Sequence, residues 1–339
     1  MPLTGDAAIW GQNDKEGMDL AAEEINKSNK LKGKKVKIIY EDSEALPQKA
    51  VSAFKKLVDI ERVTTIIGDI ASSPTFAIAP LAHQNEIVLL SPGATAPKLS
   101  ESGPFFFRIW NSDAEEGDKI ADFAFYRLNL KKIAIFYINN DYGKGLKDIF
   151  FLEYEKRGGH ISMFESFQQN DTDYKAQLNK IRIDNPDAIY LVGYPKEIPL
   201  ILRQIKEMGI KKQILGSVAF EDPGIAELAK DASEGVIYPY PIDPDPSSPT
   251  VSNFIDSFRK KYNKSPGIGA NAGYDAVNMI IKAIELSGGA KGEDIKNGLN
   301  MIKDYHGASG VMEFDKNGDV HKPIGFKIIR DGKFVWYEK

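Results

Sequence analysis

The feature that most constrains this chain is the alternation of short apolar runs with amphipathic helical patterns. The runs are rich in β-branched and aromatic residues and have the length of strands. They occupy residues 36–42, 63–69, 87–92, 105–110, 132–139, 160–167, 188–194, 213–217 and 235–241. Helical patterns, such as those at 47–61, 174–184 and 198–209, lie between them. This alternation is typical of βαβ units and predicts an α/β fold with parallel sheets.

The predicted strands are too numerous for one compact doubly wound domain, and 339 residues suit two lobes. One break is expected in "RIWNSDAEEGD", residues 108–118, after which a second series of strands and helices begins. A second break is expected in residues 240–249, which are rich in proline, aspartate and serine. Two long helical patterns follow, and the chain is expected to end in hairpins around residues 314–319 and 328–334.

Composition excludes several classes of protein. The net charge is -4 and no basic stripe is present, so neither nucleic-acid binding nor a polybasic membrane contact is supported. The chain has no cysteine, which excludes disulfides, thiolate nucleophiles and Cys-type zinc sites. No run of about 18 apolar residues is present to span a bilayer. The first residues, "MPLTGDAAIWG", do not have the pattern of a signal peptide.

Enzyme motifs are also missing. "GIGANAG", residues 267–273, imitates a dinucleotide-binding fingerprint, but a turn precedes it where that motif needs a strand. The four histidines have no metal-like spacing, and residues 315–319 lack the spaced acidic positions of a calcium loop. No nucleophile elbow or phosphate-binding P-loop occurs. We therefore expect no catalytic residues, no metal and no cofactor.

Small and aromatic groups instead follow the predicted strands, at the edge where open α/β sheets bind their ligands. Ser72 and Ser73 precede Pro74 at the start of a helical pattern, so they are expected to cap this helix, to bind an anion at its N-terminus, or both. The other strand-end residues are Gly93, Ala94, Thr95, Tyr142, Tyr194, Val218, Phe220 and Glu221. Each has an ordinary structural explanation by itself, and only their shared position favours a binding site.

Several segments carry a family resemblance: "PLTGDAAIWG", "EGMDLAAEEIN", "IIGDIASSPTFAIAPLA", "LLSPGATAPKLS", "NDYGKGL" and "GYDAVNMIIKAI". In order and spacing they resemble the type I periplasmic solute-binding proteins of branched-chain amino-acid ABC transporters. The resemblance implies two Rossmann-like lobes joined by three crossovers, which close on a ligand in the cleft between them. Lobe I is expected at 1–112 and 242–314 and lobe II at 115–239 and 320–339. It also implies a first strand before residue 2. If the protein has a presequence, this sequence does not include it.

The resemblance assigns site residues by position. Trp10 corresponds to an aromatic residue of the side-chain pocket, Ser72 to a serine that binds the ligand carboxylate, and Gly93 and Thr95 to groups that bind the carboxylate and amine. Asp113 matches an acidic position near the crossover, and Tyr142 and Tyr194 match two tyrosines of the second lobe. Val218 departs from the pattern, because the amino-acid binders have a glutamate there for the ligand ammonium; Glu221 follows three residues later.

The resulting hypothesis is a periplasmic or other extracytoplasmic solute-binding protein of an ABC importer, monomeric and without catalytic activity. Its ligand is expected to be an apolar amino acid, delivered to a membrane permease. An aromatic or aliphatic carboxylic acid without the amine is the alternative that Val218 favours. A ligand-sensing domain of a receptor or repressor, or an enzyme on this architecture, would need a membrane span, a DNA-binding header or a catalytic base, none of which the sequence contains.

Overall fold

The computed structural model describes residues 1–28, 30–31 and 33–338. Its contacts divide the chain into two compact units. Unit 1 comprises Met1–Asn111 and Asp243–Lys322, and unit 2 comprises Ser112–Ile242 and Pro323–Lys339. The chain therefore passes from one unit to the other after Asn111, Ile242 and Lys322.

Unit 1 contains a parallel three-stranded sheet with the order β1-β2-β3 and a small antiparallel pair, β10-β9. The strands are β1 (Thr65–Ile67), β2 (Val88–Ser91), β3 (Phe106–Arg108), β9 (Tyr305–Gly307) and β10 (Gly310–Met312). The helices are α1 (Ala8–Ser28), α2 (Pro47–Lys55), α3 (Ser72–Gln84), α9 (Pro249–Tyr262), α10 (Ala270–Ser287) and α11 (Gly292–Met301), with the short π-helix η1 (Lys56–Ile60) and the short 3-10 helix η2 (Pro97–Glu101).

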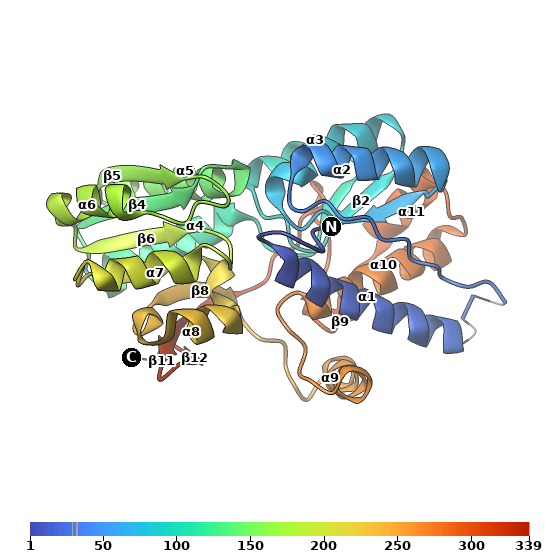
Figure 1. Ribbon diagram of the computed structural model, residues 1–339. Helices are drawn as coiled ribbons and strands as arrows, with labels where there is room; N and C mark the ends of the chain where they lie inside the picture. Colours follow the sequence, from blue (N-terminus) through green and yellow to red (C-terminus); the bar gives the residue numbers. More distant parts are fainter. Residues whose placement is uncertain (29, 32, 339) are drawn as a thin grey trace. The chain divides into compact units, whose positions relative to one another are not determined.

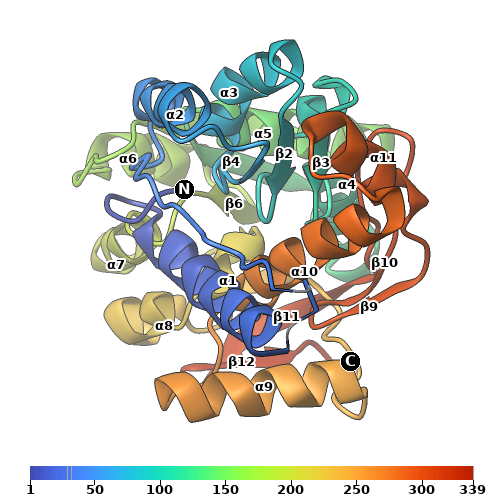
Figure 2. The same cartoon turned by 90° about the vertical axis from the view of Figure 1, so that its right-hand side faces the viewer.

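Helices α1 and α10 pack side by side in unit 1 (Figure 2). Glycines make this close approach possible. A Cβ on Gly17 of α1 would lie 1.8 Å from the Ala270 carbonyl oxygen, and a Cβ on Gly273 of α10 would lie 2.3 Å from the Asp14 carbonyl oxygen. The glycine-rich segment at residues 267–273 thus serves helix packing.

Unit 2 is built on a seven-stranded sheet with the order β12-β11-β8-β7-β6-β4-β5 (Figure 1). Strands β4 to β8 are parallel, whereas β11 pairs antiparallel with both β8 and β12. The strands are β4 (Lys132–Ile138), β5 (His160–Phe167), β6 (Ala188–Val192), β7 (Gln213–Gly216), β8 (Ile237–Pro241), β11 (Ile324–Arg330) and β12 (Lys333–Trp336). The helices are α4 (Asp113–Asp122), α5 (Asp141–Lys156), α6 (Lys175–Asp184), α7 (Ile198–Glu207) and α8 (Pro223–Ala229), with the short π-helix η3 (Phe123–Arg127) and the short 3-10 helices η4 (Val218–Glu221) and η5 (Lys230–Ser233). The predicted α/β class with parallel-sheet cores is confirmed.

The expected strand at residues 36–42 is not formed. Both backbone groups of Val36 bond to the side chain of Asn26 on α1, at 2.8 and 2.9 Å, so they are not available to a neighbouring strand. Strand β1 is the edge of the described sheet. An apolar run becomes a strand only when a partner completes its ladder.

The boundary near the C-terminus also differs from expectation, because residues 320–322 belong to unit 1. The Asn111 amide donates to the Lys322 carbonyl at 2.6 Å and accepts from the Lys322 N–H at 3.1 Å. Residues 315–319 form a tight turn closed by the Asp315 N–H on the Asp319 carbonyl, and no strand pair flanks this turn in the described chain. The second expected hairpin is confirmed as β11–β12. That the two units are ligand-binding lobes remains a prediction.

Candidate functional site

The loop after β2 is the first candidate element of unit 1. The Ser91 hydroxyl, buried at the end of β2, donates to the Asp69 carbonyl at 2.6 Å and accepts from the Ala94 N–H at 2.8 Å and, weakly, from the Gly93 N–H at 3.4 Å. These bonds hold the chain in a tight turn that presents Thr95. Within the described chain, the Thr95 N–H and Oγ1 form no protein hydrogen bond. They are two donors in a buried position, which suits an anionic group of a ligand.

Helix α3 supplies the second element. Its N-cap is Ala71, and Ser72 and Ser73 are the first two helical residues, so the expectation that the serines cap the helix is wrong. The Ser72 hydroxyl instead accepts from the Ala96 N–H at 3.2 Å, which links the helix start to the Thr95 loop. A hydroxyl that accepts one bond can still donate its proton. Ser72 therefore supplies a donor at a helix N-terminus, where the dipole favours negative charge.

Arg108, on β3, holds the Thr95 loop in place through hydrogen bonds. Its Nη1 donates to the carbonyls of Thr95 at 3.0 Å and Ala96 at 3.1 Å, and its Nε donates to Asp319 Oδ1 at 2.7 Å. The Arg108 side chain is completely buried. The carbonyl of Thr95 is therefore bound to this cation, whereas its N–H and hydroxyl form no hydrogen bond in the described chain.

Trp10 lies on α1 and is half-buried against Ala7, Ala45 and Ala71. Ala71 directly precedes Ser72, so the structure brings the predicted residues of unit 1 into one neighbourhood: Trp10, Ser72, Gly93, Ala94 and Thr95. The Trp10 side chain therefore packs next to the residue that precedes α3.

In unit 2, Asp113 is the first residue of α4 and is fully buried. One helical turn later is Glu116, which is 5 % exposed and which the sequence analysis missed. The Glu116 Oε1 accepts the backbone N–H of Val218 at 3.0 Å. Burial raises the pKa of Glu116 well above 4.5, and the charge of Asp113 raises it further, whereas the bond from Val218 lowers it. Two buried acidic side chains thus lie close together, and one of them, Glu116, binds the backbone of Val218.

The two predicted tyrosines stack on each other, with ring centroids 5.8 Å apart and planes 10° from parallel. The Tyr142 hydroxyl donates to the Ser217 hydroxyl at 2.8 Å, directly before Val218. The Tyr194 hydroxyl accepts from the amide of Asn140, the N-cap of α5, at 3.0 Å. Burial raises the pKa of Tyr142, with further contributions from Glu116 and Asp113, so its proton stays in place. Tyr142, Tyr194, Asp113, Glu116 and Val218 therefore form one cluster.

Glu221 is oriented differently from this cluster. Its Oε1 accepts from Lys327 Nζ at 2.6 Å and its Oε2 accepts from the Tyr238 hydroxyl at 2.6 Å. Lys327 is buried on β11. Glu221 is thus already paired with a cation, which weakens its candidacy for a ligand ammonium.

Comparison with known proteins now identifies the family. The family model described as "Periplasmic binding protein" matches residues 1–326. This chain belongs to that family. The family resemblance seen in the sequence is therefore confirmed, and the protein is a solute-binding protein.

Individual relatives agree with this assignment. This periplasmic binding protein is 29 % identical to the leucine-, isoleucine-, valine-, threonine- and alanine-binding protein of Pseudomonas aeruginosa over 322 residues, which is 94 % of this chain and 85 % of the relative. It is 31 % identical to the leucine-binding protein LivK of Thermotoga maritima, with a TM-score of 0.93 and coverage of 99 % and 96 %. The branched-chain amino acid binding protein LivJ of Streptococcus pneumoniae, solved with isoleucine, has 28 % identity, a TM-score of 0.89 and coverage of 98 % and 95 %.

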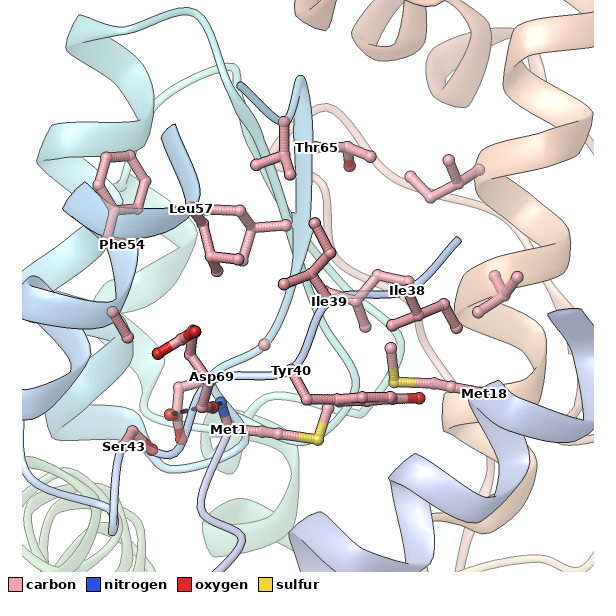
Figure 3. A pocket seen from close by; sticks show the side chains of 18 of the residues that line it. Met1, Met18, Ile38, Ile39, Tyr40, Ser43, Phe54, Leu57, Thr65 and Asp69 are labelled. Carbon is pink, nitrogen blue, oxygen red and sulfur yellow. Dashed lines mark hydrogen bonds and ion pairs between the residues drawn. The ribbon is translucent and has the colours of Figure 1, made fainter. Parts of the chain in front are cut away.

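A pocket in unit 1 lies elsewhere in this periplasmic binding protein (Figure 3). Phe54 and Leu57 line one side and Ile38 and Ile39 the other, and Asp69 lies at one end beside the terminal amine of Met1. None of the predicted site residues lines this pocket. It occupies the space beside β1 where residues 36–42 fail to pair.

The described part of this periplasmic binding protein contains no group of three His, Asp or Glu side chains that could hold a metal ion. None of its described helices is long and apolar enough to cross a bilayer.

Sequence analysis missed Glu116 and Arg108. The spacing of Asp113 and Glu116 at i, i+3 places both on one face of a helix, which was a usable signal for a paired acidic site. Arg108 carried no such signal, because its partners are distant in the sequence.

Proposed function

We propose that this protein captures an apolar L-amino acid outside the cytoplasm and delivers it to the membrane permease of an ABC importer. The protein acts as a monomer and has no catalytic activity. The relatives named for leucine, isoleucine and valine support the ligand class. The observation that carries the proposal is the Thr95 loop, whose N–H and hydroxyl remain available while Arg108 holds the carbonyl.

In this proposal the ligand carboxylate binds Ser72 and Thr95, with the Gly93 and Ala94 backbone shaping the loop. Charge-assisted hydrogen bonds contribute about 1.5–3 kcal/mol each. A few such bonds, together with burial of an apolar side chain beside Trp10, are sufficient for the roughly 8 kcal/mol of a micromolar complex. The proposal also assigns Asp113, Tyr142 and Tyr194 of unit 2 to ligand binding.

A carboxylic acid without an amine is the second candidate ligand. The observation in its favour is Val218, which cannot pair with an ammonium group where the resemblance implies a glutamate. Glu221 does not compensate in this structure, because Lys327 and Tyr238 already occupy both of its oxygens.

Matched ligands distinguish the two candidates. Thermal-shift and calorimetric titrations would use L-leucine, 4-methylpentanoate, which lacks only the ammonium, and 3-methylbutylamine, which lacks only the carboxylate. A ligand present at 100 times its Kd adds about 2.7 kcal/mol of stability. We expect L-leucine to stabilise the protein most and the amine least. Stabilisation by 4-methylpentanoate with none by any amino acid would replace the first candidate with the second.

A further inference from the structure

Val218 stands where the resemblance implies a glutamate for the ligand ammonium, so another group of unit 2 must bind an ammonium if the ligand has one. A ligand ammonium that is removed from water needs an acidic partner, because an unpaired buried cation is strongly destabilising. The side chain at position 218 is apolar, and Glu221 is held by Lys327. The answer must come from another acidic side chain close to Val218.

Glu116 has the required position. Its Oε1 is fixed by the Val218 N–H at 3.0 Å, although the two residues are 102 positions apart in the sequence. Its Oε2 forms no hydrogen bond within the described part of the chain, and no described lysine, arginine or histidine pairs with it. Glu116 is therefore a nine-tenths buried acidic side chain with one oxygen available and no cation to neutralise it.

A separate observation comes from Tyr190 on β6. The Tyr190 hydroxyl is buried and has no hydrogen-bond partner among the described residues. Burial raises its pKa, and the charges of Glu116 and Asp113 raise it further, which places the hydroxyl in the same electrostatic environment as the two carboxyl groups. A buried polar group without a partner indicates that a bound molecule or a water completes the cluster.

We propose that Glu116, together with Asp113, binds the ammonium group of the ligand and takes the place of the side chain that is missing at position 218. This inference rests on the proposed function and names the group that confers the amino-acid preference. An ammonium has three N–H donors, which matches two carboxyl groups and a neighbouring polar group. Its positive charge also favours the ionised form of Glu116, which the neighbouring charge of Asp113 disfavours.

The structure also predicts why the carboxyl group can move from position 218 to position 116 without a change of fold. The Glu116 oxygen lies at hydrogen-bond distance from the backbone N–H of Val218, so the two positions are direct neighbours. A glutamate restored at 218 should therefore substitute for one removed at 116.

Calorimetry with L-leucine and 4-methylpentanoate tests the proposal on four proteins: wild type, Glu116→Gln, Glu116→Gln with Val218→Glu, and the control Glu227→Gln. Glu227 is an exposed glutamate of the same unit, on α8. We expect Glu116→Gln to weaken L-leucine binding by at least about thirtyfold, the range for a buried cation that loses its partner. Affinity for 4-methylpentanoate should change by less than about threefold, since that ligand has no cation, and the control should match the wild type.

The double variant should recover at least about tenfold of the lost L-leucine affinity, and Glu116→Asp should retain more of it than Glu116→Gln, because both keep a carboxyl group nearby. A single cooperative thermal unfolding transition in each protein would show that every variant folds. L-leucine binding that stays within threefold of wild type in Glu116→Gln would overturn this inference and leave the proposed function intact. A wild-type protein that binds 4-methylpentanoate and no amino acid would overturn both.

Discussion

The Arg108 guanidinium and the Asp319 carboxylate form a two-point ion pair inside unit 1, with Nε to Oδ1 at 2.7 Å and Nη2 to Oδ2 at 3.0 Å. The two residues are 211 positions apart. Nη1 of Arg108 donates to the carbonyls of the loop that presents Thr95, and Nη2 also donates to the Ser100 hydroxyl. This pair therefore joins the last segment of unit 1 to the loop that we assign to the ligand carboxylate.

We expect the loss of the Arg108–Asp319 ion pair to destabilise unit 1 strongly. Asp319→Asn leaves the Arg108 charge buried without its partner, which should lower the free energy of unfolding of unit 1 by about 3–5 kcal/mol. Urea unfolding followed by circular dichroism measures the change. Lys49→Gln, which removes an ion pair to Glu44 that is 47 % and 35 % exposed, should cost less than about 1 kcal/mol. Equal effects of the two substitutions would contradict the role assigned to Arg108.

The Thr95 hydroxyl predicts a specific loss of affinity. Thr95→Val keeps the shape of the side chain and removes the donor, so binding of L-leucine should weaken by about 1–3 kcal/mol with little change in stability. Ser72→Ala should weaken binding similarly and should also lower stability by about 1 kcal/mol, because the Ala96 N–H loses its acceptor.

Thr64→Val is the control for these two variants, since its hydroxyl donates to the Ala290 carbonyl at an exposed position of the same unit. Titration calorimetry compares the three. If all three bind L-leucine like the wild type, the Ser72 and Thr95 hydroxyls do not bind the ligand.

Glu116 predicts a pH dependence for the ligand-free protein. Its folded pKa is raised above the usual 4.5 by burial and by Asp113. The folded state then binds more protons than the unfolded state above pH 4.5. The stability that this group contributes is complete below pH 4.5 and is lost as the pH rises through the raised folded pKa.

Glu116→Gln should remove this loss, so the ligand-free variant should be more stable than wild type at pH 7 by about 0.5–2 kcal/mol, as is common when a destabilising functional group is replaced. Asp113, Tyr142 and Tyr190 also face this group, and all three remain in both proteins. The difference between the two stability curves from pH 4 to pH 8 therefore isolates Glu116. A difference that does not vary with pH would show that its pKa is ordinary.

We expect a larger side chain at Gly17 to disturb the packing of α1 against α10. Gly17→Ala places a methyl group 1.8 Å from the position of the Ala270 carbonyl oxygen, so α1 and α10 must separate. The cost should be about 1–3 kcal/mol, despite the better helix propensity of alanine. Gly288→Ala, at the end of α10, has open space around it but a φ of +73°, so it should cost only the backbone strain of about 1–2 kcal/mol. Chemical denaturation of both variants, with crystallography to detect a shift of α1, tests the steric explanation.

The amino-acid sequence by itself determined the class of fold and most of its elements. Strand and helix patterns are local, because they depend on residues two, three or four positions apart, and so the α/β alternation was readable along nearly the whole chain. The candidate ligand-binding residues with hydroxyl or aromatic side chains could be predicted for the same reason, because they directly follow strands. Asp113 and Glu116 are separated by one helical turn, so even the missed glutamate was accessible to this kind of reasoning.

The tertiary structure decided everything that depends on a distant partner. Residues 36–42 have the composition of a strand, yet their backbone bonds go to Asn26 on α1. Ser72 has the sequence context of a cap, yet its hydroxyl accepts from Ala96, 24 residues away. Glu221 is a glutamate like Glu116, but Lys327, 106 residues further on, donates to its carboxylate, whereas no described protein cation pairs with Glu116. The sequence shows which side chains carry a charge. Their partners depend on which distant segments the fold brings into contact, and a charge that already has a protein partner is less available to a ligand.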